Sequence, residues 1–159
     1  HTEQIRLSKQ IRLCIAELFN TENMNSYSME IEIDDDANDA IISCDVRLIS
    51  RAITNLVHNS MKHNPQGCTI RLQLAYDKKD LATHKLLLII EDDGIGFSED
   101  KLYEINNKPH YLESLDERLD LRHGLGLLIV KQIVTVHNGT MTIEQVLPHG
   151  CRVILGFNV

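Results

Sequence analysis

Two glycine clusters, about thirty residues apart, contain the residues best suited to bind an anion. The first is Asp92-Asp93-Gly94-Ile95-Gly96-Phe97, and the second is His123-Gly124-Leu125-Gly126-Leu127. Glycine allows the main chain to approach a ligand closely, and a helix that begins at such a cluster directs free N–H groups and the positive end of its dipole toward phosphate. A carboxylate beside the first cluster can accept a hydrogen bond from an amino group. Either cluster alone is common at ordinary turns, but the pair predicts a nucleotide pocket.

A polar stripe on one predicted helix adds a second kind of chemistry. Asn55, Asn59 and Lys62 are spaced at i, i+4 and i+7 and therefore share one side of a helix. An Asn carbonyl is a neutral hard oxygen that suits Mg²⁺, which takes its other ligands from water and phosphate, and an ammonium nearby can meet phosphate charge. The alternative is a solvated polar face on a surface helix. The glycine clusters favour a magnesium and triphosphate site.

The elements that must position these groups follow from the spacing of apolar residues. Helices are predicted over 3–19, over 46–63 with Asp45 as N-cap, and over 125–136. Strands are predicted over 27–33, 41–42, 69–76, 85–91, 140–146 and 152–157, and the first two are expected to form a small hairpin. Residues 97–122 are predicted to be a long loop with a short helix near 98–105. This order favours an α/β sandwich in which helices pack on one face of a mixed sheet.

Composition limits the class of protein. A chain of 159 residues with 43% apolar and 25% charged residues suits one globular domain, and a net charge of −7 disfavours nucleic-acid and anionic-membrane surfaces. The four cysteines are scattered without zinc-site spacing, so free thiols in the cytosol are expected. No apolar run approaches the roughly twenty residues that cross a bilayer. We therefore expect a cytoplasmic domain without direct membrane contact.

The order and spacing of the motifs resemble those of one family. The segments that carry the resemblance are Asp45, Asn55-Leu-Val-His-Asn59-Ser-Met-Lys62-His63-Asn64-Pro65, Asp92-x-Gly94-x-Gly96 and Gly124-Leu125-Gly126-Leu127. They are similar to the catalytic and ATP-binding domain of sensor histidine kinases, in the superfamily of gyrase-type, mismatch-repair and heat-shock chaperone ATPases. The resemblance covers essentially the whole chain and implies the Bergerat ATP-binding fold, an α+β two-layer sandwich with a mostly antiparallel sheet and three main helices on one face.

The resemblance also implies roles around the metal and the base. Asn59 would coordinate Mg²⁺, Lys62 would contact phosphate, and Asp92 would accept a hydrogen bond from the adenine amino group. The pocket for the base would be lined by Gly94 and Gly96. At His63 the family usually has an aromatic ring, so stacking on the nucleotide or a ribose contact is implied, with a partly exposed helix-end histidine as the alternative.

Further implied roles lie around the phosphates. The second cluster, formed by His123, Gly124, Leu125, Gly126 and Leu127, would hold phosphate at the start of a helix. Residues 97–122 would be the ATP lid, in which Arg118 and Arg122 are candidates for γ-phosphate contact or belong to a solvated charge run. Three departures put lid closure or nucleotide affinity in question: the lid has no Phe pair, Asp93 replaces the usual Asn, and His123 replaces a small hydroxyl residue.

Asn55 bears on the reaction, because the related ATPases have a Glu there as general base and an amide cannot take a proton. The domain is therefore expected to hold ATP for attack by a histidine and to hydrolyse it poorly. No stretch resembles the phosphoacceptor and dimerisation domain, so we expect a monomer of one domain, 1–159. This domain would donate the γ-phosphate to a histidine of a separate domain, from which the phosphoryl group would pass to a response regulator. The alternatives are a nucleotide-sensing or dormant scaffold module, and a serine kinase like the anti-sigma relatives, which Asn55 disfavours.

Overall fold

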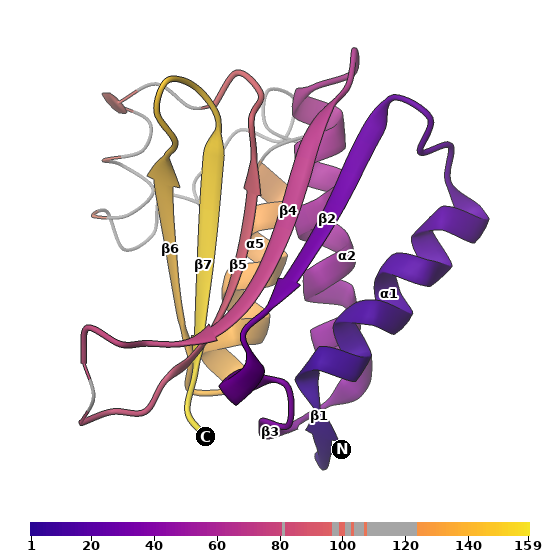
Figure 1. The fold of residues 1–159 in the computed structure, drawn as a ribbon. Coiled ribbons are helices and arrows are strands. Elements are labelled where there is room, and N and C mark those ends of the chain that lie inside the picture. The colour runs from indigo at the N-terminus through magenta and orange to yellow at the C-terminus, as the bar shows by residue number, and fades with distance from the viewer. Residues whose placement is uncertain (81, 97–98, 101–102, 104–106, 108–123) are drawn as a thin grey trace.

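The computed structural model describes residues 1–80, 82–96, 99–100, 103, 107 and 124–159 (Figure 1). The helices are α1 (Leu7–Thr21), α2 (Val46–His63) and α5 (Gly124–Val136), with a short 3₁₀ turn, η1, at Asp35–Ala37. The strands are β1 (Glu3–Arg6), β2 (Tyr27–Ile33), β3 (Ile41–Cys44), β4 (Cys68–Tyr76), β5 (Leu86–Asp92), β6 (Thr140–Gln145) and β7 (Cys151–Phe157). In the described part of the chain, no helix is both long and apolar enough to span a membrane.

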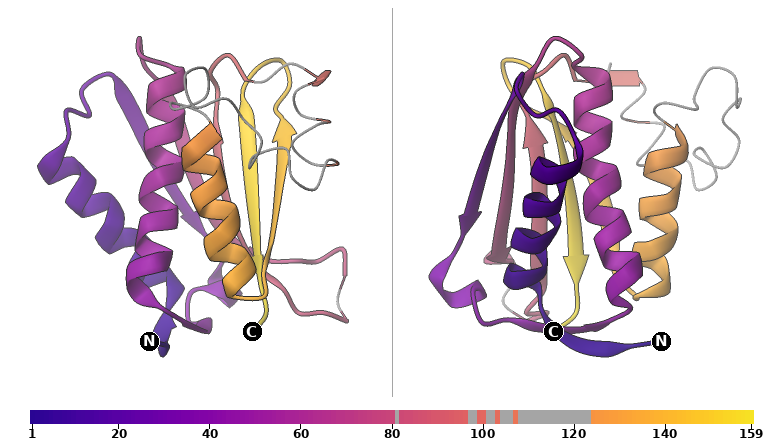
Figure 2. Two further views of the ribbon diagram at one scale, coloured as in Figure 1. Left: turned by 180° about the vertical axis from the view of Figure 1, so that it is seen from behind. Right: turned by 90° about the vertical axis from the view of Figure 1, so that its right-hand side faces the viewer.

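Five strands form the main sheet in the order β2-β4-β5-β7-β6. The β2–β4 pair is parallel, and the other three pairs are antiparallel. Helices α1, α2 and α5 lie on the same face of this sheet, as the side view in Figure 2 shows. The predicted two-layer sandwich, with a mixed and mostly antiparallel sheet and three helices on one face, is confirmed.

The core lies between the sheet and the helices. Alternate residues of β5 point into it, and Leu86, Leu88 and Ile90 are almost completely buried. The next residue in this alternation is Asp92, so the period of the strand places a carboxylate at a core-facing position. From the other layer, α2 contributes the predicted apolar stripe, of which Ile53 is fully buried.

The predicted start of the first helix is wrong. Residues 3–6 form β1, which pairs antiparallel with β3 from Glu3↔Cys44 to Arg6↔Ile41, and the helix begins only at Leu7. A four-residue strand is too short to interrupt the helical spacing of apolar residues that follows it. Tertiary pairing with β3 therefore decided the backbone conformation of this segment.

The predicted hairpin between 27–33 and 41–42 is also wrong. β3 pairs with β1 in a separate two-stranded sheet, whereas β2 pairs in parallel with β4. The connection explains this arrangement, because Ala37 in η1 is fully buried and the Asn38 carbonyl accepts from Ser8 Oγ at 2.7 Å and from Arg6 Nε at 3.0 Å. These contacts hold the chain against the start of α1 and prevent it from turning back along β2.

Both ends of α2 lie where the sequence predicts them. Asp45 Oδ1 accepts from Arg47 N at 3.0 Å and from Leu48 N at 3.4 Å, and the helix ends at His63 before Pro65. A cross-link joins this N-cap to α5, because Asp45 N donates to His137 Nε2 at 3.0 Å. Nδ1 of the same ring lies 2.7 Å from the Ile133 carbonyl, so a neutral ring with its proton on Nδ1 satisfies both contacts.

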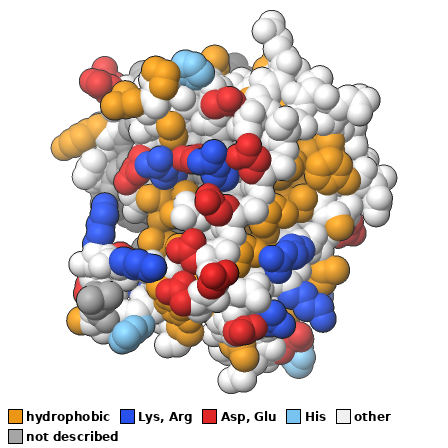
Figure 3. All heavy atoms as spheres, in the orientation of Figure 1, with side chains coloured by type: hydrophobic (Ala, Val, Ile, Leu, Met, Phe, Trp, Pro, Cys, Tyr) orange, Lys and Arg blue, Asp and Glu red, His pale blue; other side chains and the backbone are white. Residues whose placement is uncertain are grey.

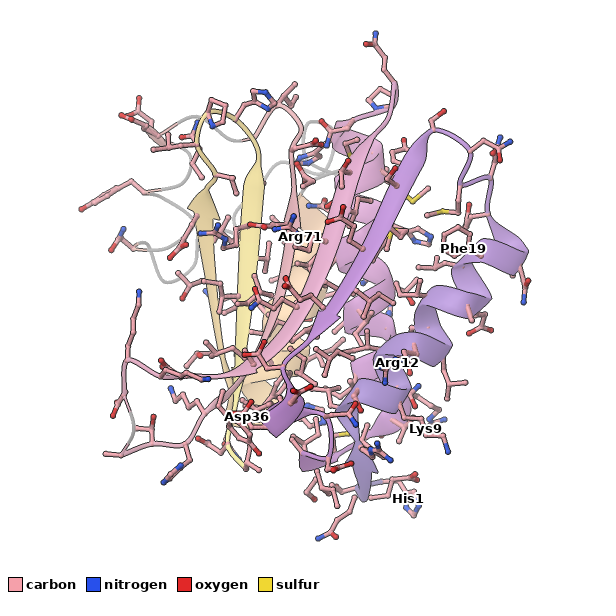
Figure 4. The ribbon with its side chains drawn as sticks, in the orientation of Figure 1. His1, Lys9, Arg12, Phe19, Asp36 and Arg71 are labelled. Atoms are coloured by element: carbon pink, nitrogen blue, oxygen red, sulfur yellow. The ribbon has the colours of Figure 1, made fainter. Side chains whose placement is uncertain are left out.

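The face of the sheet opposite the helices has a row of alternating charges, one from each strand: Glu30, Arg71, Glu91, Arg152 and Glu144. Successive neighbours form ion pairs at 3.0, 3.4, 2.9 and 3.2 Å. Figure 3 shows the row crossing this face, and Figure 4 labels Arg71 within it. A solvent-exposed pair such as Arg71–Glu30 contributes about 0–1 kcal/mol. The row gives this face of the sheet a band of charged side chains.

Candidate nucleotide-binding site

Three element ends meet at one end of the sandwich. The C-terminal end of α2, the C-terminal end of β5 and the N-terminal end of α5 all lie there, and α2 and α5 pack against each other (Figures 1 and 2). Both described chain termini lie at the opposite end (Figure 1). The fold thus brings together the polar stripe of α2, the carboxylate that ends β5 and the glycines that begin α5.

Asn59 is the most unusual polar group of this region. It is only 8% exposed, and no donor among the described residues reaches its Oδ1. A Cβ built on Gly126 at the start of α5 would lie 3.9 Å from this oxygen, so the two groups face each other across the α2–α5 contact. A buried acceptor without a partner costs about 1–3 kcal/mol. The arrangement fits a hard cation, or water bound to one, as the missing partner.

The other members of the stripe are more accessible. Asn55 is half-buried one turn before Asn59, and Lys62 is exposed one turn after it. All three are helical residues of α2, so the spacing that predicted a common side is confirmed. Because the Lys62 side chain is exposed, its ammonium is accessible to an anionic ligand.

Asp92 is a buried carboxylate, 6% exposed, at the end of β5. Burial raises its pKa, while hydrogen bonds from the Gly94 N–H, the Ser60 hydroxyl and the Cys151 N–H act in the opposite direction. The Gly94 N–H lies 3.0 Å from Oδ1. These donors fix the orientation of the carboxylate, which is what an acceptor for a specific amino group requires.

The loop after Asp92 is held from both sides. Asp93 Oδ1 accepts from Thr69 N at 2.8 Å, and the Gly94 carbonyl lies 3.1 Å from His149 Nδ1. Gly96 has φ +71, and a Cβ there would lie 2.6 Å from the Gly150 carbonyl, so glycine is required at this position.

Asn64 contacts the same loop from α2. Its Oδ1 accepts from Ile95 N at 3.1 Å, and its Nδ2 donates to the Ser60 carbonyl at 2.9 Å. A Cβ on Gly94 would overlap the Asn64 side chain, so the first glycine of this cluster serves close approach. The sequence analysis assigned no role in the site to Asn64, Ser60 or His149. Asn64 precedes Pro65 and reads as an ordinary turn residue, and no spacing rule indicated the contact.

The second cluster is described from Gly124 onward. Gly124 begins α5, and Leu127 is 1% exposed and belongs to the core. Leu127 therefore contributes packing at the helix start, and the helical backbone of Gly124, Leu125 and Gly126 supplies the free N–H groups of the first turn. Arg118, Arg122, His123 and most of the predicted short helix near 98–105 lie outside the described residues.

A cleft of about 620 Å³ opens beside the first glycine loop. His63, Asn64, Gly94, Ile95 and His149 are among its lining residues. His63 and Gly94 thus line the same cleft. Asn59 and Asp92 lie outside its lining.

Three comparisons with known proteins identify the family. Residues 44–159 match the model for histidine kinase-, DNA gyrase B- and HSP90-like ATPases. The chain is 31% identical over 131 residues to hybrid signal transduction histidine kinase D of Dictyostelium discoideum and 32% identical over 136 residues to the sensor protein KdpD of Clostridium acetobutylicum. These alignments cover 80% and 84% of this chain but only 8% and 14% of the relatives.

Solved structures show the same fold. The catalytic domain of histidine kinase ThkA superposes with a TM-score of 0.75 at 20% identity, over 99% of this chain and 95% of that one. The mycobacterial sensor histidine kinase MprB gives a TM-score of 0.71 at 19% identity, over 99% and 97%. The chain belongs to the family of histidine kinase-, DNA gyrase B- and HSP90-like ATPases, and the relatives that it matches include sensor histidine kinases.

Proposed function

We propose that this chain binds Mg-ATP and supplies the γ-phosphate to a histidine on a separate dimerisation domain, as the catalytic part of a two-component sensor kinase. The observation that carries the proposal is the buried Asn59 Oδ1, which faces Gly126 and has no donor among the described residues. The oriented carboxylate of Asp92 at the same end of the sandwich supports it. These two groups offer an acceptor for a metal and an acceptor for a base.

In this proposal each described group has one task. Asn59 is the protein ligand of Mg²⁺, Lys62 meets phosphate charge, and Asp92 accepts from the adenine amino group. The magnesium ion supplies neutralisation of phosphate charge when bound. The first turn of α5, from Gly124, holds phosphate with its N–H groups.

The remaining sites of contact are proposed from the sequence. Gly94 and Gly96 line the base pocket, and His63 stacks on the nucleotide or contacts the ribose. Arg122 contacts phosphate from the ATP lid, 97–122, and His123 does so from the second glycine cluster.

Asn55 favours transfer to a histidine over hydrolysis. Its side chain lies one turn before Asn59 on α2, and an amide cannot act as general base toward water. Phosphoryl transfer depends mainly on positioning and charge neutralisation, which the groups above supply. The nucleophile comes from the partner domain.

The names of the relatives support the proposed partners. They include a sensor protein, KdpD, and a signal transduction histidine-protein kinase/phosphatase, MprB, and the chain spans a small part of the curated relatives it matches. We propose that 1–159 is one domain of a longer cytoplasmic kinase region, monomeric by itself, and that a response regulator receives the phosphoryl group through the complete kinase. Neither nucleic acid nor a membrane surface is a proposed partner.

Two measurements test the proposal. Calorimetry should show binding of ATP that strengthens when Mg²⁺ is added, and labelled ATP should phosphorylate a histidine-bearing dimerisation domain added in trans. ATP binding without transfer to any such domain would favour the dormant or nucleotide-sensing module instead. Steady-state hydrolysis by the isolated chain above about 1 s⁻¹, the low end of ordinary enzyme turnover, would contradict the role assigned to Asn55.

A further inference from the structure

Asn64 connects two parts of the site that are distant in sequence. It follows α2, the helix that carries Asn59, and its side-chain oxygen accepts from Ile95 N in the loop after Asp92, at 3.1 Å. The residue is 6% exposed. Its amide is buried and forms one hydrogen bond to the helix and one to the loop. It therefore links the proposed metal-binding helix rigidly to the proposed base-binding loop.

The Tyr27 side chain on β2 anchors the backbone of this link. Its Oη lies 2.9 Å from the Asn64 carbonyl and 3.0 Å from the Met61 carbonyl, so the two carbonyls share its single O–H donor. The amide Nδ2 donates to the Ser60 carbonyl at 2.9 Å, which fixes the rotamer. The side-chain oxygen therefore has one position available from which to meet the loop.

The loop after Asp92 leaves space for the Asn64 amide. Gly94 leaves no room for a Cβ, because the Asn64 amide occupies that space. One turn earlier on the same helix, the Ser60 hydroxyl bonds the Asp92 carboxylate. Ser60 and Asn64 are thus an i, i+4 pair that holds both the carboxylate and the loop beside it.

From this arrangement we propose that Asn64 is a positioning residue that holds the 92–95 segment at the separation from α2 needed to read the amino group of the purine. The inference rests on the proposed function. A hydrogen bond weakens steeply when its geometry is lost, and a guanine presents a carbonyl where adenine presents its amino group. Selection of adenine over guanine therefore depends on where Asp92 is held, whereas metal and phosphate contacts depend on α2 and α5.

The test uses Asn64→Leu, which keeps the approximate shape of the side chain but removes its acceptor, and Asn64→Ala as a second variant. The matched control is Asn23→Ala, because Asn23 Oδ1 also accepts from a backbone N–H, that of Asn25 at 3.1 Å, on an exposed turn. Circular dichroism and thermal melting establish that each variant folds. Hydrogen exchange of the Ile95 amide then reports the link directly, without nucleotide.

We expect faster exchange at Ile95 in both Asn64 variants and unchanged exchange in the control. ATP affinity should fall about tenfold, the scale of one lost hydrogen bond. The ratio of ATP to GTP affinity should fall with it, while the strengthening of binding by Mg²⁺ should persist. A simple loss of structure would reduce ATP and GTP binding alike.

Two outcomes overturn the inference. If the wild type binds ATP but the ATP-to-GTP ratio is unchanged in both variants, Asn64 does not position the base loop, and the proposed function stands. If the wild type binds no ATP, the proposed function fails and the positioning role fails with it.

Discussion

Gly126 and Asn59 face each other across the contact between α5 and α2, with 3.9 Å between Asn59 Oδ1 and the place a Gly126 Cβ would occupy. That separation is an ordinary van der Waals contact, so the fold itself leaves room for a side chain at position 126. The glycine is then best explained by a ligand group, phosphate or its metal ion, that must fit between the two residues.

Gly126→Ala should make the protein more stable and weaken its nucleotide binding. Alanine is up to about 1 kcal/mol better than glycine in a helix interior, and Gly126 lies in the first turn of α5, where part of this preference applies. The added methyl group points toward the oxygen proposed to bind Mg²⁺ and narrows the space for phosphate. Chemical denaturation and calorimetry with Mg-ATP measure the two effects, and a variant that binds ATP as tightly as the wild type would contradict the phosphate site.

Asn59→Ala should abolish the dependence of ATP affinity on Mg²⁺ while changing stability by less than about 1 kcal/mol. The substitution removes a buried acceptor that has no donor among the described residues, and this gain offsets part of the lost packing. The measurement is an ATP titration with and without Mg²⁺. Asn25→Ala, on an exposed turn, is the control, and an unchanged magnesium effect in Asn59→Ala would exclude this residue as the ligand.

Asp92→Asn should increase stability at neutral pH and remove ATP binding. Because burial raises the pKa of Asp92, its contribution to stability is complete below the unfolded-state value near 3.8 and is lost as pH rises through the higher folded-state value. The amide resembles the protonated acid and does not incur this loss. The difference in unfolding free energy between variant and wild type should therefore grow in favour of the variant from pH 3 toward pH 7, and a constant difference would refute the prediction.

Asn55→Glu should raise ATP hydrolysis by the isolated chain. The substitution places a carboxylate one turn before Asn59, where the related ATPases have their general base, and such a base contributes on the order of a hundredfold or more. Asn55→Gln, which is similar in length but cannot take a proton, is the control. Equal hydrolysis by the two variants would show that the absence of a base at this position does not limit the reaction with water.

The cysteines should react slowly with iodoacetamide in the folded protein. Burial raises the pKa of Cys68 and of Cys151 to about 12, and that of Cys44 to about 11, so little thiolate is present at pH 8. All four cysteines are free thiols in the structure and should be labelled after denaturation. Mass spectrometry before and after adding denaturant measures the difference, and rapid native labelling of Cys68 would contradict its environment.

Local sequence signals located most of the elements, but two pairings depended on distant residues. Asp45 as N-cap and Pro65 after the helix mark the ends of α2 through interactions within a few residues, and both were predictable. The pairing of β1 with β3 joins segments about forty residues apart, from Glu3 to Cys44, and no local pattern encodes it. The same holds for β2, whose parallel partner β4 follows only after η1, β3 and α2.

In the candidate site, too, some features were predictable from the sequence and others depended on distant residues. Asn59 and Asp92 were indicated by motif spacing, and the structure adds that both are buried at one end of the sandwich. The contact of Asn64 with Ile95 was not predictable, because it joins two turns through a side chain whose type is common in turns. Leu127 was expected to contact the ligand, but its side chain is buried in the core. The start of α5 must also pack against the rest of the domain, and Leu127 provides that contact.

The cross-link from His137 to Asp45 N ties α5 to α2 at the end remote from the glycines. The 13 residues of α5 separate this cross-link from the glycine end by about 20 Å. A change in the His137 contact that tilted the helix by about five degrees would therefore displace the glycine end by roughly 2 Å.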